Sequence, residues 1–244
     1  SWPLWLDHFD SLWLAATGLV PSSADYRDIS LYDQSKASAA IAVALWRYHA
    51  EKSRISEADI SKIRNRADWS EKKLLLIQGD FTGIQNFIFS EGSKTNKSAA
   101  KLLRGRSFYV SLVTELAALK VLEELDLPST SQIINAAGKF QILAPNTGAV
   151  REKLAEVRKA FDGWFLENTL GTSALNLVWT EASCDDFVQR RFPDLMKRLF
   201  EELDKAKLQS LRLCELKSPV LDVAYPYGAC VYHGKLPADR EGDQ

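Results

Sequence analysis

Residues 74–89 read LLLIQGDFTGIQNFIF, and this stretch decides the fold. Its first four residues form a short continuous apolar run, which is typical of a strand buried on both faces. The strand carries Gly79, Asp80 and Gly83 at its C-terminal end, where glycine permits a positive φ and a close approach of the backbone to a ligand. Asp80 can hold a metal there or cap the turn. The residues alone favour a capped tight turn, because Asp and Gly dominate turns for local reasons.

The elements that follow this strand predict an α+β fold. Hydrophobic periodicity and Gly or Pro breaks indicate the order strand, helix, strand, strand, helix, strand and a final helix. The predicted ranges are strands at 74–77, 132–135, 140–144 and 173–180, helices at 98–125 and 149–167, and a helical stretch at 185–216. This is the ferredoxin-like βαββαβ order, which predicts an antiparallel sheet on one side and two helices on the other.

The flanking residues predict two further parts. Helices are expected at 2–18 and 28–51, and the charged residues 59–68 are expected to be a solvated linker. After residue 216 the chain loses its periodicity. The predicted organisation is therefore a helical segment at 1–70, a ferredoxin-like domain at 71–217 with a long C-terminal helix, and an irregular segment at 218–244.

Composition excludes several classes of protein. The chain has 244 residues, 46% of them hydrophobic, and a formal net charge of −1. It is therefore not a disordered protein, and no apolar run is long enough to cross a membrane. The 3 cysteines are widely spaced and make no disulfide framework, so a reducing cytoplasm is expected. The chain begins at Ser1 and its single Met is Met196, which predicts a piece of a longer protein.

Four stretches resemble the large subunit of type III-A CRISPR effector complexes, the Csm branch. Residues 79–89, GDFTGIQNFIF, are similar to the GD-(I/F)-(S/T)-GIQ-x-FIF signature of that subunit's first palm domain. The other stretches are DISLYDQSKASAAIA at 28–42, KLLRGRSFY at 101–109 and NAAGKFQILAPN at 135–146, and all four follow in family order. Together they are specific for this family.

The resemblance implies a function for the parent protein. The family's large subunit has an HD nuclease domain, two cyclase-like palms, a zinc-binding insertion and a C-terminal helical domain. It works in an antiviral ribonucleoprotein with CRISPR RNA and the other complex subunits, and pairing with target RNA switches on cleavage of single-stranded DNA. The paired palms join ATP, with Mg²⁺, into cyclic oligoadenylate.

The sequence departs from the family where catalysis is concerned. The Gly-Gly-Asp-Asp synthase motif of the second palm is absent, and none of His8, His49 and His233 is followed by Asp, as the nuclease requires. Metal-assisted phosphoryl transfer needs clustered carboxylates to hold the ions. We therefore expect this chain alone to be inactive and to carry no catalytic residue, although its palm binds one ATP as half of a composite site.

The resemblance also implies which residues contact ATP. The expected contacts are Gly79, Asp80, Thr82, Gly83, Gln85, Arg104, Arg106, Ser107, Gly138 and Lys139. Lys139 lies where an active palm carries metal-binding acids. A lysine cannot ligate Mg²⁺, but its ammonium can meet a phosphate as a point charge. The alternative for Asp80 is a structural turn that braces the sheet.

A local basic run has three open interpretations. Lys94, Lys97, Lys101, Arg104 and Arg106 gather at the start of the helix predicted at 98–125. Cations at a helix N-terminus favour a triphosphate, yet the same groups can contact the CRISPR RNA backbone. A solvated helix face is the third interpretation.

Two further features could bind metals. Cys230-x-x-His233 resembles the first half of the family's zinc insertion, and a structural zinc site needs four ligands, so this is an incomplete half-site. Asp33 is either a metal ligand of the nuclease region or a capping, hydrogen-bonding residue.

Two other functions stay open at this stage. The domain could be a non-catalytic scaffold palm that docks neighbouring CRISPR subunits and CRISPR RNA. It could also be an unrelated, degenerate cyclase-like sensor domain.

Overall fold

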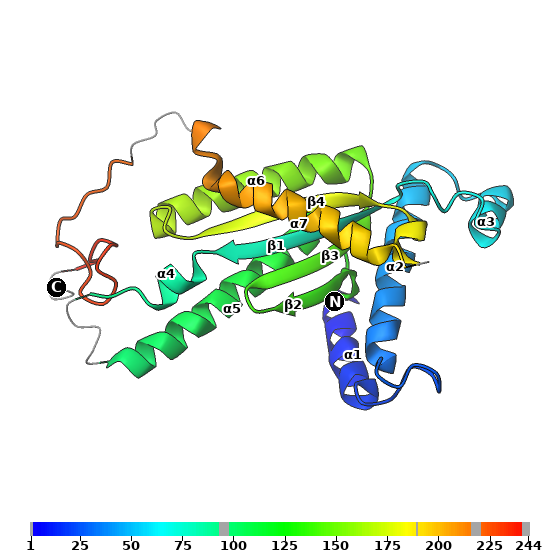
Figure 1. Ribbon diagram of the computed structural model, residues 1–244, viewed down its shortest axis with the longest axis horizontal. Coiled ribbons are helices and arrows are strands. Elements are labelled where there is room, and N and C mark those ends of the chain that lie inside the picture. The colour runs from blue at the N-terminus through cyan, green and yellow to red at the C-terminus, as the bar shows by residue number, and fades with distance from the viewer. Residues whose placement is uncertain (1, 93–97, 189, 216–220, 241–244) are drawn as a thin grey trace.

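The computed structural model describes residues 2–92, 98–188, 190–215 and 221–240. Its centre is a 4-stranded antiparallel sheet with the strand order β2-β3-β1-β4 (Figure 1). The strands are β1 (Leu74–Thr82), β2 (Gln132–Ala136), β3 (Lys139–Pro145) and β4 (Ala174–Ala182). Helix α5 (Ala99–Glu124) connects β1 to β2, and α6 (Gly148–Thr169) connects β3 to β4. This topology confirms the ferredoxin-like α+β prediction.

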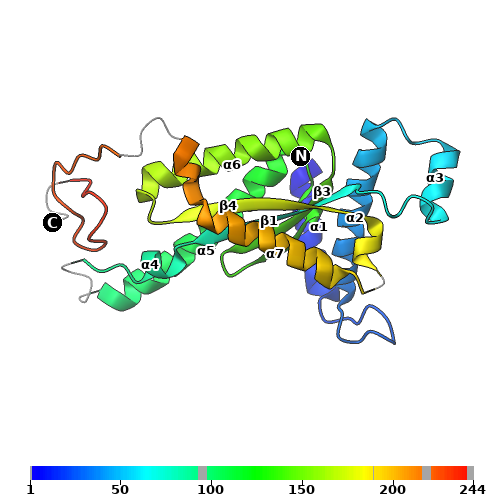
Figure 2. The ribbon, with the colours of Figure 1, turned by 45° about the horizontal axis from the view of Figure 1, so that its top comes forward.

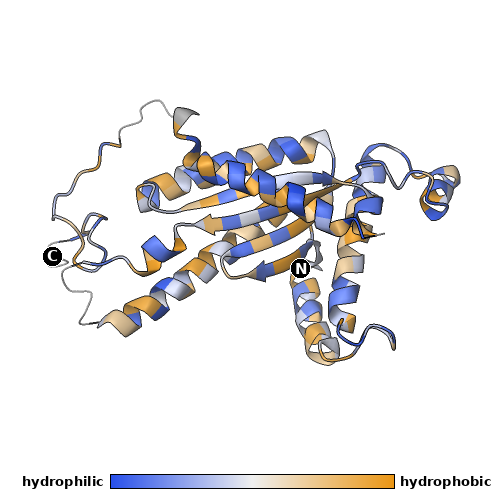
Figure 3. Ribbon diagram, in the orientation of Figure 1, coloured by the Kyte–Doolittle hydropathy of each residue, from blue (hydrophilic) through white to orange (hydrophobic). Residues whose placement is uncertain are grey.

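Strand β1 is longer than predicted. Gly79 and Asp80 lie inside it, because both pair with β3 on one side and with β4 on the other. The turn comes only at Gly83, whose φ of 86° is left-handed, and the short helix α4 (Ile84–Ile88) follows at once. Figure 3 shows hydrophilic residues interrupting the hydrophobic central strands.

The predicted pair of helices on one face of the sheet is confirmed by α5 and α6, and two further helices cover the other face. On one face Leu75, Ile77 and Phe81 pack with α5 and α6. On the other face Leu74 and Leu76 pack with α2 (Leu31–Glu51) and α7 (Phe192–Leu208). Figure 2 shows the sheet between α6 and α7. The cause is the continuous apolar run of β1, since successive side chains of a strand point to opposite faces.

The small side chains of α2 let it approach the sheet closely. Ala40 and Ala44 are fully buried in the same cluster as Leu74 and Leu76. The predicted helical segment at 1–70 therefore contributes to the core of the predicted domain at 71–217. Helix α1 (Trp2–Thr17) contacts α2.

The charged stretch predicted as a linker contains a helix, α3 (Glu57–Arg64). Ser56 and Asp59 form a capping box at its start, in which each side chain bonds the backbone N–H of the other residue. Capping of this kind stabilises a short polar helix that has no buried face. The remaining elements are the 3₁₀ helices η2 (Ser129–Ser131), η3 (Cys184–Phe187) and η4 (Ser210–Glu215). Among the described helices, none is both long and apolar enough to span a bilayer.

Candidate functional site

A buried carboxylate lies near the end of the central strand. Asp80 of β1 is opposite Lys139 of β3 and Asn176 of β4, and it is only 3% exposed. It belongs to the same alternating set as Leu74 and Leu76, so its side chain lies on the sheet face toward α7. On this face of β1, the apolar residues Leu74 and Leu76 are thus followed by a polar residue near the C-terminal end of the strand.

Two lysines neutralise this carboxylate, one at each oxygen. The Nζ of Lys207, in the last turn of α7, is 2.8 Å from Oδ2 of Asp80. The Nζ of Lys139 is 3.9 Å from Oδ1. A carboxylate this deeply buried needs such partners, because an unpaired buried charge is strongly unfavourable. The lysine side chains are 38% and 52% exposed, so the group presents an excess of positive charge to solvent.

Neutral side chains fix the surroundings of Asp80. The Nδ2 of Asn176 donates to Oγ1 of Thr82 at 2.5 Å, and Oγ of Ser210 donates to Oδ1 of Asn176 at 3.2 Å. On the same face, Nε2 of Gln141 donates to Oε1 of Gln78 at 2.9 Å. These bonds connect β1 to β3 and β4, and β4 to the start of η4, two residues after α7.

The predicted glycines serve the fold. A Cβ on Gly79 would lie 2.2 Å from a ring carbon of Phe140, so Gly79 makes room for that ring on the face toward α5. Gly138 has a φ of +79°, and a Cβ there would lie 2.7 Å from Cδ1 of Ile84. Gly83 is the N-cap residue of α4, and Gln85 is exposed on that helix. Of the predicted contacts in β1 and the hairpin, Asp80, Thr82 and Lys139 are the ones that share the α7 face.

The predicted contacts on α5 lie on a helix that packs against the opposite face. Arg104 and Ser107 are exposed there. The guanidinium of Arg106 donates to the carbonyl oxygens of Ile88, Ser90 and Tyr232 at 2.7–2.9 Å. Arg106 thus joins the end of α4 to the C-terminal segment. Of the basic run, Lys94 and Lys97 lie outside the described residues.

The Cys230-x-x-His233 segment folds as a tight turn. The N–H of Gly234 donates to the carbonyl of Cys230 at 2.7 Å, and the segment packs so closely on Gly92 that a Cβ there would lie 2.1 Å from the Val231 oxygen. His233 is buried and its Nδ1 has no hydrogen-bond partner. Burial, with the nearby charges of Arg106 and Lys235, lowers the pKa of His233, which favours the neutral form that a metal requires. Cys230 and His233 line the same cavity, and the zinc half-site stays a prediction.

Asp33 is exposed and takes part in the N-terminal cap of α2. Its carboxylate accepts a hydrogen bond from Oγ of Ser30 at 2.7 Å, and its N–H donates to the same oxygen at 3.0 Å. This arrangement is the capping role. The described part of the chain contains no group of three or more His, Cys, Asp or Glu side chains placed to hold a metal ion.

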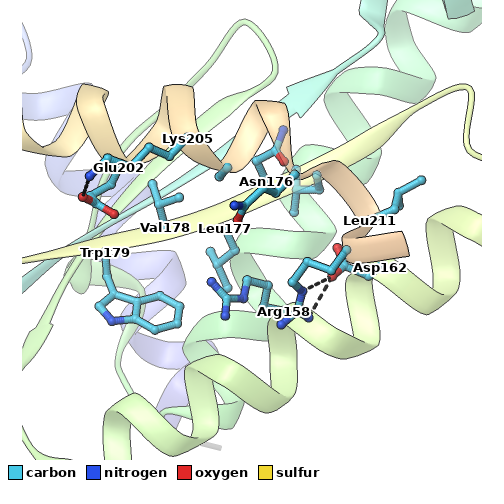
Figure 4. Close-up of a pocket in the computed structure, with 13 residues that line it drawn as sticks. Arg158, Asp162, Asn176, Leu177, Val178, Trp179, Glu202, Lys205 and Leu211 are labelled. Carbon is cyan, nitrogen blue, oxygen red and sulfur yellow. Dashed lines mark hydrogen bonds and ion pairs between the residues drawn. The ribbon is translucent and has the colours of Figure 1, made fainter. Parts of the chain in front are cut away.

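A cavity of about 310 Å³ lies beside this site, between α6 and α7 (Figure 4). Five consecutive residues of β4, Leu175 to Trp179, line it, and Asn176 is shared with the Asp80 group. Its charged residues are engaged with neighbours: Arg212 pairs with Asp162 at 2.8 Å, and Arg158 lies over the ring of Trp179. None of the residues predicted to contact ATP lines this cavity.

Sequence reasoning missed Lys207, Asn176 and Ser210. The helix that carries Lys207 was predicted, and a lysine in its last turn was visible in the sequence. Nothing in the local pattern shows that this lysine reaches Asp80, because the contact depends on how α7 crosses the sheet.

Comparison with known proteins identifies the family. A family model described as Csm1 subunit domain B matches residues 73–220. The chain belongs to this family. It is 33% identical over 193 residues to the CRISPR system single-strand-specific deoxyribonuclease Cas10/Csm1 (subtype III-A) of Thermococcus onnurineus strain NA1, which covers 78% of this chain and 23% of that relative. The resemblance to type III-A large subunits is thus confirmed.

Solved structures of Csm1 agree with the fold. The Csm1-Csm4 cassette in complex with AMPPNP has a TM-score of 0.66 and 31% identity, covering 81% of this chain and 26% of that one. The cassette in complex with cA4 has a TM-score of 0.64 and 31% identity, covering 78% of this chain and 24% of that one. The chain therefore spans about a quarter of the length of these Csm1 proteins.

Proposed function

We propose that this chain acts as the first palm of a type III-A CRISPR large subunit and binds one ATP as half of a composite site that makes cyclic oligoadenylate. The observation that carries the proposal is the buried Asp80 carboxylate held between two half-exposed lysines. Ammonium groups attract phosphates, and a carboxylate is the ligand that Mg²⁺ takes when bound with a nucleotide. The binding of AMPPNP and cA4 by structurally similar Csm1-Csm4 cassettes supports a nucleotide as the ligand.

Within this proposal the chain binds and orients its nucleotide. Lys139 would meet the phosphates from the β2–β3 hairpin, and Asp80 would be the carboxylate that holds the divalent cation. Bound Mg²⁺ would stabilise the charge that develops on the transferred phosphate. The described residues hold no cluster of metal-binding acids, so a second palm supplies those acids and aligns a 3′-hydroxyl with the α-phosphate.

The parent protein's other activities belong to the same proposal. Its partners are the other Csm subunits, CRISPR RNA, target RNA and single-stranded DNA, in a prokaryotic cytoplasm, and a nuclease domain cuts the DNA. Cys230 and His233 supply two ligands of the zinc insertion, and the remaining ligands come from elsewhere in the parent. The name of the Thermococcus relative, a single-strand-specific deoxyribonuclease, supports the nuclease assignment.

The test is an oligoadenylate assay on the complete complex. We expect Asp80→Ala to abolish product formation, whereas Asp194→Ala, on the exposed start of α7, leaves it unchanged. Unchanged product from both Asp80→Ala and Arg104→Ala would overturn the nucleotide-site assignment.

A second candidate function, a scaffold palm that docks a neighbouring subunit, is favoured by one surface. Helix α5 carries an exposed apolar row formed by Phe108, Leu112, Leu116 and Leu119. Residues at this spacing lie on one helix face, and such rows pair with other helices. Loss of complex assembly in Leu116→Ser, with normal ATP binding, would favour the scaffold function. Normal assembly in Leu116→Ser would reject it.

A further inference from the structure

The lysine closest to Asp80 comes from outside the sequence motif. Lys207 Nζ is 2.8 Å from the Asp80 carboxylate, whereas the motif residue Lys139 is 3.9 Å away. The packing of α7 fixes the position of Lys207, because Leu199 and Leu203 of this helix are buried against the sheet. Just beyond Lys207, Ser210 is hydrogen-bonded to Asn176 of β4. Lys207 is therefore held at the site by the fold and is not a loosely tethered surface charge.

The net charge of Asp80, Lys139 and Lys207 favours a negatively charged ligand. Asp80, Lys139 and Lys207 sum to one excess positive charge, and both lysine side chains are partly exposed while the Asp80 side chain is 5% exposed. A phosphate can therefore approach the lysines directly. A phosphate that takes both ammonium groups removes the counterions of Asp80, which leaves a buried and unpaired carboxylate.

A divalent cation removes this difficulty. Mg²⁺ commonly binds through one or two carboxylates together with substrate phosphates. Held by Asp80, it would replace the ammonium charge that the carboxylate has lost. The geometry thus favours a triphosphate that arrives with its cation over a free triphosphate.

We propose that Lys207 is a phosphate-binding residue and that the magnesium complex of a triphosphate binds here by ion-pair exchange. Lys139 and Lys207 leave Asp80 for phosphate oxygens, and Asp80 accepts the cation in their place. The inference rests on the proposed nucleotide-binding function and adds to it the residue on α7 and the reason for cation dependence.

The test is calorimetric titration of the chain with ATP and with inorganic tripolyphosphate, each with Mg²⁺ and with a chelator. Lys207→Met keeps the length of the side chain and removes its charge, and we expect it to weaken both magnesium-bound ligands by about tenfold or more. Lys205→Met is the matched control, because Lys205 lies on the same helix but pairs with Glu202 at 2.6 Å and is 67% exposed. It should bind like the wild type, and Lys207→Arg should restore most of the affinity.

Asp80→Asn tests the exchange itself. This variant has no buried charge to compensate, so we expect the ratio of its triphosphate affinities with and without Mg²⁺ to fall to about one. The affinity of the wild type should fall by about tenfold or more when the cation is removed. Equal binding by Lys207→Met and Lys205→Met, or an unchanged Mg²⁺ requirement in Asp80→Asn, would overturn the inference and leave the proposed function intact. No binding by the wild type would overturn the proposed function. A melting curve for each variant establishes that it is folded.

Discussion

Replacing Gly79 by alanine should destabilise the chain through Phe140. The two residues face each other across β1 and β3, and Phe140 is fully buried. A Cβ on Gly79 would lie 2.2 Å from Cε1, 2.3 Å from Cζ and 2.8 Å from Cδ1 of the ring. Carbon atoms in contact rest about 3.5–4.0 Å apart, so the ring has to move by more than about 1 Å.

The expected loss is about 2 kcal/mol of unfolding free energy. Forcing extra volume into a close-packed core costs about 1–3 kcal/mol, and a contact this short belongs in the upper part of that range. Alanine recovers about 0.5–1 kcal/mol relative to glycine, because it restricts the unfolded chain. For a chain of this size, a loss of about 2 kcal/mol lowers the Tm by about 4–8 °C.

The assay is urea and thermal unfolding of the chain followed by circular dichroism. Gly163→Ala is the matched control, because Gly163 lies in α6 and nothing lies within 4 Å of its added Cβ. That variant should gain about 0.5–1 kcal/mol, as alanine does in an open helix position. Combining Gly79→Ala with Phe140→Leu makes room for the new methyl, so the double variant should lose at least about 0.5 kcal/mol less than the sum of the two single losses.

Two results would refute this reasoning. One is wild-type stability in Gly79→Ala, and the other is full additivity with Phe140→Leu. If Gly79→Ala instead lost ATP binding at unchanged stability, Gly79 would be a residue of the ligand site.

Three further predictions concern the groups around the sheet. Burial and the charge of Lys73 lower the pKa of His49 from 6.5, so the unfolding free energy should be highest above pH 6.5 and should fall as the pH drops below it. Urea titrations at pH 5 and pH 7.5 should show this fall in the wild type and much less of it in His49→Gln. Burial opposes ionisation of Asp186, but hydrogen bonds from Lys72, Ser183 and Arg198 outweigh it and hold its pKa well below 3.8. The ionised Asp186 therefore contributes stability that is present above pH 3.8 and is lost as the pH falls further. Asp186→Asn should cost about 2 kcal/mol at pH 7, and equal urea midpoints for this variant and the wild type would contradict the assignment. Arg106→Ala should release the segment that Arg106 joins to α4, and faster chymotryptic cleavage at Tyr232, with Arg104→Ala as the unchanged control, would show it.

The order of elements could be predicted because it depends on local patterns. The hairpin turn at Ala137-Gly138 and the long apolar runs are visible in neighbouring residues, and the structure has strands β2 and β3 on either side of that turn. The capping box of α3 is also present in the sequence, as Ser56 followed three residues later by Asp59, but the prediction of a linker used only the charge of the stretch. The cover on the second face of the sheet was implied by the continuous apolar run at 74–77, although which helices supply it depends on long-range contacts.

The candidate site was only partly predictable for the same reason. Gly79 and Asp80 are neighbours in one motif, yet the alternation of a strand sends one toward Phe140 and leaves the other with Lys207. The Gly79-Asp80 pair therefore meets two requirements: Gly79 leaves space for a buried ring, and Asp80 places a charge near the strand end. A resemblance in sequence does not separate these two roles. Since Gly79 affects the position of β3, and β3 begins with Lys139, a substitution at Gly79 also changes the site indirectly. Ligand-binding losses at the glycines thus identify a contact only when stability is measured alongside, whereas losses at Lys207, on a different element, report on the charged group itself.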